Sequence, residues 1–328
     1  MTPIGHDANL ATFLAAMASG RLHHAWLLTG PRGVGKAMFA DAAAARLLAE
    51  AAGPPPTDTG LDVEPDHRIA RLIAAGSHPD LIRLTRLEND RTKSLARNIS
   101  VDQIRGLGPR FATMPSLSPR RVVVIDAIDD LEAPAANALL KSLEEPPAGT
   151  IFLLVSHAPA RLLPTVRSRC RQLRFGRLDA ADMARVLRGA LPGATEEEIA
   201  VLAAIGAGSP GAGLRFAGLE IAALDAELDR LARDGDRGNA RRSALAQSLS
   251  AKAAQPRYEA FLDRAPSRIA QEAQRRQGLA LAAAIGLWEH ARDLARAAPG
   301  LSLDPQTTVF EIAGLVAALA PDERSVKG

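Results

Sequence analysis

The sequence predicts an α/β domain with a parallel β-sheet and a phosphate-binding loop, followed by purely helical parts. A glycine-rich segment joins a short apolar strand to an Ala-rich helix within 26–52, which is the opening unit of nucleotide-binding α/β domains. Fully apolar runs alternate with helical segments up to residue 175, as in parallel sheets covered on both faces. After residue 176 no convincing strand pattern recurs.

Length and composition limit the class of protein. A chain of 328 residues predicts two or three domains. The formal net charge of +3 is small and does not by itself argue for nucleic-acid binding. The single cysteine, Cys170, excludes an intramolecular disulfide and fits a reducing cytosol, so a cytoplasmic location is expected. There is no long apolar run and no signal-peptide pattern at the start, so we expect no membrane contact.

Residues 1–175 are predicted to form five strands, which are short apolar or β-branched runs. The expected strands are 26–29, 81–84, 121–126, 151–156 and 172–175. The expected helices are 7–19, 36–52, 101–113 and 135–145, the last ended by Pro146 and Pro147. Loops are expected at 53–66 and 88–100.

The chain beyond residue 176 is predicted to be helical. Thr195 begins a capping-box pattern that opens a short helix, and the glycines of 206–213 interrupt the chain. Later amphipathic helices are expected around Leu224, from 269 to 294, and after Asp304 and Pro305, with a loop at 233–243.

The segment Gly30–Ala37 matches the phosphate-loop pattern G-x-x-x-x-G-K-[ST] except at its last position. Gly30, Gly33 and Gly35 would let backbone N–H groups approach phosphate oxygens, and Lys36 would place a positive charge on them. Ala37 lacks the hydroxyl that normally ligates Mg²⁺. Two interpretations stay open: weak or metal-poor binding of ATP or ADP, and a loop that is retained only for packing.

An acidic position ends the strand 121–126. Asp126 could serve magnesium or could merely cap the strand end, whereas Ala127 cannot orient an attacking water or accept its proton. Asp129 and Asp130 follow, and we expect their side chains to point elsewhere. Ala37 and Ala127 lie in separate elements and together predict loss of ATP hydrolysis.

An ordered set of motifs accompanies the glycine-rich loop. The motifs are GRLHHA at 20–25, HPD at 78–80, NALLKSLEEPP at 137–147, SHAP at 156–159 and LLPTVRSRC at 162–170. This set resembles the bacterial clamp-loader subunits of the AAA+ family, and the triplet of Ser168, Arg169 and Cys170 is its most diagnostic part. The resemblance is dense over 1–175 and weak afterwards.

The resemblance implies an architecture and a set of partners. It implies an AAA+ domain at 1–175, a small helical lid at 176–218 and a helical collar at 219–328. It also implies assembly with gamma/tau motor subunits and a delta subunit in a hetero-pentamer. Through that complex the chain would help load the β sliding clamp onto primed DNA.

Three departures from the family pattern distinguish among its subunits. The motor subunits resemble this chain but carry Thr or Ser at the position of Ala37 and Glu at that of Ala127. They also carry an arginine where Pro210 follows Ser209. The resemblance is therefore to the non-hydrolysing delta-prime type. The alternatives are an active gamma/tau-type ATPase and a DNA-binding module that acts alone.

The resemblance assigns Arg169 as an arginine finger that completes the ATP site of a neighbouring subunit. The alternative is a surface arginine paired with an acid. Arg167 and Arg171 flank it and could instead face DNA phosphates. Asn137 and Lys141 lie one helical turn apart and are either at a subunit interface or on a solvated face.

Zinc is not expected. Family members often bind zinc through four cysteines between the first helix and the second strand, but 53–77 contains none. His67 and His78 cannot form a closed four-ligand site alone. Cys170 is expected to be a small buried residue and not a nucleophile, because no partner arrangement is evident.

Overall fold

A computed structural model describes residues 3–88 and 95–321. Its chain divides into two compact units, Met1–Leu214 and Arg215–Gly328, which are considered separately below. The middle of the expected loop 88–100 lies outside the described residues. Among the helices described, none is both long and apolar enough to cross a membrane.

The first unit contains a five-stranded parallel sheet in the order β2-β3-β4-β1-β5. Its strands are β1 Ala25–Thr29, β2 Leu81–Leu84, β3 Arg121–Asp126, β4 Thr150–Ser156 and β5 Arg171–Arg174. All five predicted strands are confirmed, and the side chains of β1 and β4 are buried along their whole length. Fully apolar strands need a cover on both faces of the sheet.

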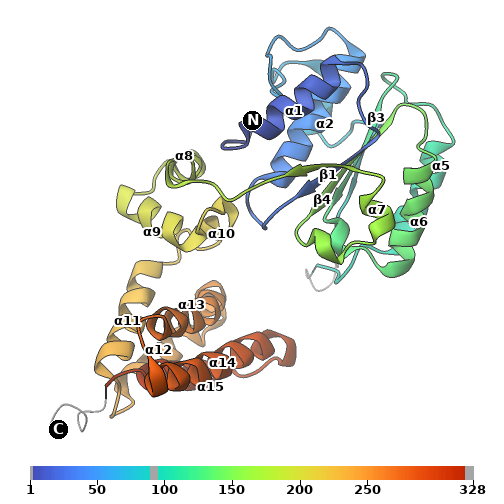
Figure 1. Ribbon diagram of the computed structural model, residues 1–328. Helices are drawn as coiled ribbons and strands as arrows, with labels where there is room; N and C mark the ends of the chain where they lie inside the picture. The colour runs from blue at the N-terminus through green and yellow to red at the C-terminus, as the bar shows by residue number, and fades with distance from the viewer. Residues whose placement is uncertain (1–2, 89–94, 322–328) are drawn as a thin grey trace. The chain divides into compact units, whose positions relative to one another are not determined.

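Helices supply that cover (Figure 1). One face packs against the helices α4 Val101–Arg105, α5 Leu107–Phe111, α6 Ala133–Glu144 and α7 Pro164–Arg167. On the other face, Phe13 of α1 Asp7–Ala18 and Phe39 of α2 Lys36–Ala52 pack together, and Phe13 also contacts Trp26 of β1. The helix α3 Arg68–Ala74 follows the loop 53–66 and was not predicted.

The expected helix 101–113 is wrong as a single element. It is two short helices, α4 and α5, that meet at Gly106. Pro109 has no backbone N–H to donate to the carbonyl of Arg105, so a continuous helix would lose a hydrogen bond at this point. By contrast, α6 ends at Glu144 before the two prolines, as expected.

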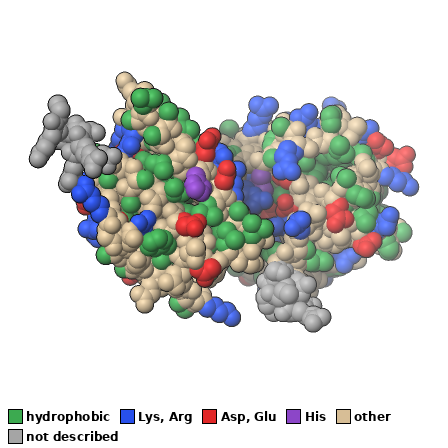
Figure 2. Space-filling model, turned by 90° about the horizontal axis from the view of Figure 1, so that it is seen from below, with side chains coloured by type: hydrophobic (Ala, Val, Ile, Leu, Met, Phe, Trp, Pro, Cys, Tyr) green, Lys and Arg blue, Asp and Glu red, His purple; other side chains and the backbone are tan. Residues whose placement is uncertain are grey.

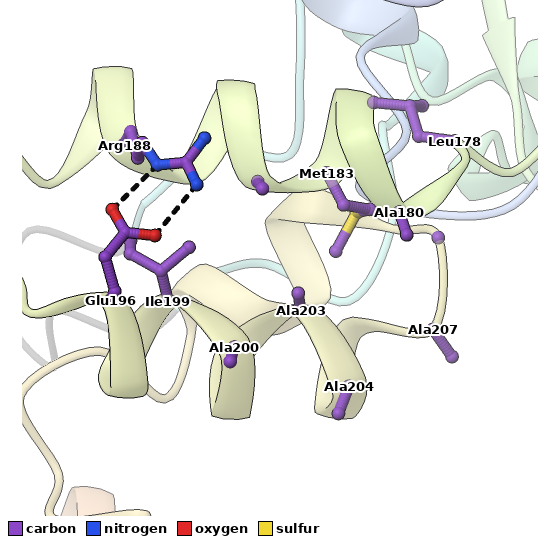
Figure 3. A pocket seen from close by; sticks show the side chains of 12 residues that line it. Leu178, Ala180, Met183, Arg188, Glu196, Ile199, Ala200, Ala203, Ala204 and Ala207 are labelled. Carbon is purple, nitrogen blue, oxygen red and sulfur yellow. Dashed lines mark hydrogen bonds and ion pairs between the residues drawn. The ribbon is translucent and has the colours of Figure 1, made fainter.

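Three helices complete the first unit, α8 Ala180–Ala190, α9 Glu196–Gly206 and α10 Pro210–Leu214. Thr195 caps α9 by accepting a hydrogen bond from the backbone N–H of Glu198 at 3.2 Å. The short helix α10 begins inside the stretch 206–213 that was expected only to break the chain. An open cavity of about 530 Å³ lies between α8 and α9, with an ion pair between Arg188 and Glu196 at one end (Figure 3).

The second unit is entirely helical over its described residues. Its helices are α11 Ile221–Asp234, α12 Ala240–Leu249, α13 Gln255–Ala273, α14 Gly278–Leu301 and α15 Pro305–Ala317, with the 3-10 turn η3 Lys252–Ala254. The expected single helix 269–294 is wrong, because α13 ends at Ala273 and the chain turns back before α14. Gly278, at the start of α14, has a φ of 57° in the left-handed region that favours glycine.

The expected boundaries at 175/176 and 218/219 stay predictions about domains. The first compact unit ends at Leu214 and contains both the sheet and the helices α8 to α10. The segment expected to be a lid is therefore part of the same unit as the glycine-rich loop up to Leu214, and its last four residues belong to the second unit.

Candidate functional site

The glycine-rich loop joins the carboxyl end of β1 to α2, as predicted. Gly30, Gly33 and Gly35 all have positive φ, at 146°, 76° and 103°. A Cβ on Gly30 would lie 2.1 Å from the carbonyl oxygen of Phe175, and a Cβ on Gly33 would lie 2.5 Å from Ser209 Oγ. These two glycines are therefore required by packing alone, whether or not a nucleotide binds.

Lys36 is turned back into the loop. Its Nζ donates hydrogen bonds to the carbonyl oxygens of Gly30, at 2.6 Å, and of Pro31. The residue is 2% exposed, and burial lowers the pKa of its ammonium group to about 8, against the opposing effect of Asp126. The predicted phosphate ligand thus already has acceptors from its own loop. Ala37 follows it in α2 and presents only a methyl group.

The chain after α9 rests on the same loop. Ser209 Oγ donates to the carbonyl of Arg32 at 2.6 Å, and the backbone N–H of Gly211 donates to the carbonyl of Gly33 at 2.9 Å. Sequence reasoning noted Ser209 only as the residue that precedes a missing arginine. Its contact with the loop spans 177 sequence positions and has no local signal.

The contact of His6 with the glycine-rich loop was also not predicted from the sequence. Its buried ring lies 2.6 Å from the carbonyl oxygen of Val34 through Nε2 and packs edge-on against Phe175, with ring centroids 4.7 Å apart. The residue precedes α1 by one position, and nothing in its sequence neighbourhood indicates a contact with the glycine-rich loop.

The acidic strand end lies beside this loop. Asp126 ends β3, and burial raises the pKa of its carboxyl group. Ala127 is buried and offers no carboxylate. A 3-10 turn, η1 Ile128–Asp130, brings the next two acids back to the same edge of the sheet.

Asp129 and Asp130, whose side chains were expected to point elsewhere than that of residue 127, have other partners at this edge. Asp129 accepts hydrogen bonds from Ser156 Oγ at 2.9 Å and from the backbone N–H groups of His157 and Ala158. Asp130 lies 4.0 Å from Arg32 in the glycine-rich loop and 3.3 Å from Arg86. Both carboxylates therefore have partners, and neither replaces a carboxylate at position 127.

A cavity of about 550 Å³ opens beside the loop, between β1, the segment after β4, and β5. Its charged side chains are Arg167 and Arg174, and His157 also lines it. Burial first, and then Lys36 and Arg32, lower the pKa of His157 to about 4, so its ring is neutral near pH 7. On the face shown in Figure 2, Lys and Arg side chains are interspersed with acidic and hydrophobic ones.

Arg169 lies at the amino ends of the parallel strands, whereas the glycine-rich loop lies at their carboxyl ends. Arg169 precedes β5 by two residues, whereas the glycine-rich loop follows β1, and these strands run parallel with Trp26 opposite Arg171 and Thr29 opposite Arg174. At about 3.3 Å per residue, the paired stretch separates the two edges by roughly 10 Å. The guanidinium is bound within the chain: Nη2 lies 2.6 Å from Glu144 Oε1, and Nη1 donates to the carbonyl of Thr165 at 2.8 Å.

The other members of the triplet have structural contacts. Ser168 Oγ donates to the carbonyl of Thr165 at 3.1 Å. Cys170 packs against the core, and burial raises the pKa of its thiol to about 12, so the thiol is protonated and unreactive near pH 7. This agrees with the expectation of a structural cysteine.

Asn137 and Lys141 are exposed on α6, one turn apart. Glu144 follows at the next turn, so the three side chains share one face of the helix. Glu144 on this face forms an ion pair with Arg169. Whether a partner subunit covers it stays a prediction.

Among the described residues, no group of three or more His, Cys, Asp or Glu side chains is arranged to hold a metal ion. His67 caps α3 through Nδ1, and His78 Nδ1 accepts from the backbone N–H of Asp80. The absence of zinc stays a prediction.

Comparison with known proteins identifies relatives of this chain. Residues 5–179, slightly more than half of the chain, match the family model described as DNA polymerase III, delta subunit. The DNA polymerase III subunit delta' of Pseudomonas aeruginosa is 40% identical over 187 residues, which are 57% of this chain and 53% of that protein. The DNA polymerase III subunit tau of Salmonella typhimurium is 34% identical over 204 residues, 60% of this chain and 28% of that protein.

A solved structure of a DNA polymerase III gamma subunit-related protein from Thermotoga maritima aligns with 94% of this chain and 99% of its own, at 13% identity and a TM-score of 0.45. The chain spans about half the length, or less, of these curated relatives.

Proposed function

The chain belongs to the family of DNA polymerase III delta subunits, and from that premise we propose that it is a non-hydrolysing clamp-loader subunit of the delta-prime type. In this role it supplies Arg169 to an ATP site on a neighbouring subunit and helps load the β clamp onto primed DNA. The parallel sheet with the glycine-rich loop at its carboxyl edge is the AAA+ fold that this role requires.

The position of Arg169 is the observation that carries the proposal. Arg169 and the chain's own glycine-rich loop lie at opposite edges of one parallel sheet. An arginine finger acts by placing its charge on the transferred phosphoryl group, so Arg169 cannot serve a nucleotide held by Lys36 of the same chain. It is exposed enough, at 33% of its side chain, to serve a nucleotide on another subunit.

The chain's own site supports the non-hydrolysing role. Ala37 and Ala127 lack the groups that hold Mg²⁺ and orient water, and Asp129 and Asp130 are bound to other partners. Lys36 is bonded to loop carbonyls, and Ser209 and Gly211 hold the loop from outside. Any ATP or ADP must displace the Lys36 contacts, so we expect weak binding and no hydrolysis by the chain alone.

The proposed partners follow from the same family. They are the gamma/tau motor subunits, whose sequences are related to this chain, and a clamp-opening delta subunit, together in a hetero-pentamer. Asn137 and Lys141 are proposed to contact the neighbour whose nucleotide Arg169 reaches, because they lie on the exposed face of α6 next to it.

The first experiment reconstitutes the motor and clamp-opening subunits with this chain and measures ATP hydrolysis stimulated by primed DNA and the clamp. Addition of the chain should raise the rate, and its Arg169→Ala form should fail to do so, with a loss of about 10³-fold or more at the completed site. Arg161→Ala is the matched control, because Arg161 is a surface arginine of the same segment, in the turn η2 Pro159–Arg161.

Two outcomes would contradict the proposal. One is a rate that does not respond to addition of the chain. The other is Mg²⁺-dependent hydrolysis by the chain alone that Lys36→Ala abolishes, since that result would make the chain an autonomous ATPase.

A further inference from the structure

The ion pair between Glu144 and Arg169 joins two separate elements of the first unit. Glu144 is the last residue of α6, and Arg169 lies between α7 and β5. Glu144 Oε1 lies 2.6 Å from Arg169 Nη2, and the Thr165 carbonyl accepts from Arg169 Nη1 at 2.8 Å. Both terminal nitrogens of the guanidinium are therefore oriented before any partner binds.

We propose that Glu144 is a positioning residue for Arg169: with the Thr165 carbonyl, it holds the guanidinium in the orientation used toward a neighbouring subunit's nucleotide. The inference rests on the proposed function, since it needs a phosphate presented by another subunit. It goes beyond that function by assigning a role to a residue outside the arginine's own motif.

The guanidinium of Arg169 has enough N–H donors to keep these two contacts and also bind a phosphate. An arginine has five N–H donors in a rigid planar fork, and the two contacts need only one donor each. The remaining donors can reach phosphate oxygens from the exposed side. The side chain is 33% exposed and that of Glu144 is 49% exposed, so the pair is open to an approaching ligand.

Glu144 and Arg169 both lie next to residues that are buried in the core, which favours positioning. Glu144 follows Leu139 and Leu143, which bury α6 in the core. Arg169 follows the buried Val166 and precedes Cys170, which packs against the same core. A flexible arginine side chain loses conformational entropy when it binds a ligand. An arginine whose rotamer is already fixed loses less entropy on binding.

The position of the Glu144–Arg169 ion pair agrees with the proposed positioning role of Glu144. Glu144 shares one face of α6 with Asn137 and Lys141, which are also exposed. The helix ends at Glu144, so the ion pair joins this face of α6 to Arg169. Exposed ion pairs contribute little to stability, so the removal of Glu144 should leave the fold intact.

The test uses the reconstituted clamp loader with this chain carrying Glu144→Ala. We expect the stimulated kcat for ATP hydrolysis to fall about threefold to tenfold, while KM for ATP stays within about twofold. Glu145→Ala is the matched control, because Glu145 is the adjacent exposed carboxylate and should leave both values unchanged. Circular dichroism and the thermal unfolding midpoint check that each variant folds.

Two further variants separate positioning from a general structural role. Glu144→Gln keeps an oxygen acceptor for Arg169 and should recover most of the lost kcat. In the Arg169→Ala background, Glu144→Ala should have no further effect on the residual rate, because its target is gone.

The outcomes distinguish this inference from the proposed function. An unchanged or faster rate with Glu144→Ala, while Arg169→Ala removes stimulation, overturns the positioning role and leaves the proposed function standing. An equal loss in the Arg169→Ala background also overturns it, since Glu144 would then act through another contact. If Arg169→Ala itself has no effect, the proposed function fails first.

Discussion

At the scale of single residues, Lys36 of the glycine-rich loop is held by its own loop. Its ammonium group is buried and satisfied by the carbonyls of Gly30 and Pro31, and burial lowers its pKa from 10.5 to about 8. The folded state thus gives up this proton at a lower pH than the unfolded chain. Burial of this charge lowers the free energy of unfolding. The loss is fully present below pH 8 and disappears as the pH rises toward 10.5.

This pKa is directly measurable by NMR of ¹³C-labelled lysine side chains, because the sequence contains few lysines. We expect one resonance to titrate with a midpoint near 8 and to be absent from Lys36→Met, whereas exposed lysines titrate near pH 10.4. A midpoint above pH 10 for Lys36 would contradict its burial.

The same titration reports on nucleotide binding. A phosphate beside Lys36 favours the charged ammonium and should move the midpoint upward from about 8. A midpoint that is unaffected by millimolar ADP would favour a loop retained for packing.

At the scale of elements, the contact between α10 and the glycine-rich loop ties the expected lid segment to the sheet. A Cβ on Gly211 would lie 2.8 Å from the Cα of Gly33, which is a backbone atom that cannot move aside cheaply. Two hydrogen bonds run across the same contact, from Ser209 and from Gly211.

Gly211→Ala should therefore destabilise the first unit by about 1–3 kcal/mol, as overpacking typically does. Calorimetry or thermal circular dichroism should show a lower unfolding midpoint for that unit. Gly189→Ala is the control: Gly189 lies within α8 with open space at its Cβ, so alanine should stabilise the helix by up to about 1 kcal/mol. Equal midpoints for the two variants would argue against the close approach.

At the scale of the whole molecule, the second unit offers surface for assembly. α14 has 24 residues, but only Ala284, Ala291 and Ala298 are buried. Leu279 is 90% exposed and Ile285 is 41% exposed on the same helix. Exposed apolar side chains on one helix are a candidate binding surface, which the proposed collar role requires.

If α14 forms the proposed collar interface, Leu279→Glu combined with Ile285→Glu should weaken assembly with the motor subunits by about tenfold or more, because the change would place charge in that interface. Sedimentation or light scattering of the mixed subunits measures this, and the unfolding midpoint of the isolated chain should not fall. Met114→Glu, at a side chain 74% exposed in the first unit, is the matched control. Assembly that tolerates the α14 change would leave the collar role without support from this helix.

Local pattern was enough to predict most of the first unit. The five strands, the glycine-rich loop and α2 follow from short apolar runs and glycine positions, which act over a few residues. The errors are also local in origin. Pro109 splits 101–113 into two helices, and the turn before Gly278 divides 269–294, because one missing N–H or one left-handed residue outweighs a continuous apolar pattern.

The sequence by itself determined the fold class and, through the resemblance of its motifs, the family. Motif spacing singled out Lys36, Ala37, Asp126 and Ala127, the resemblance singled out Arg169, and the roles of these residues stay predictions. Only the tertiary structure decided what these residues contact. Ser209 on the loop, Lys36 on the loop carbonyls and Glu144 on Arg169 depend on where separate elements meet in space. Such contacts carry no periodic signal, because side-chain partners far apart in the chain are set by the packing of whole elements and not by local backbone preference.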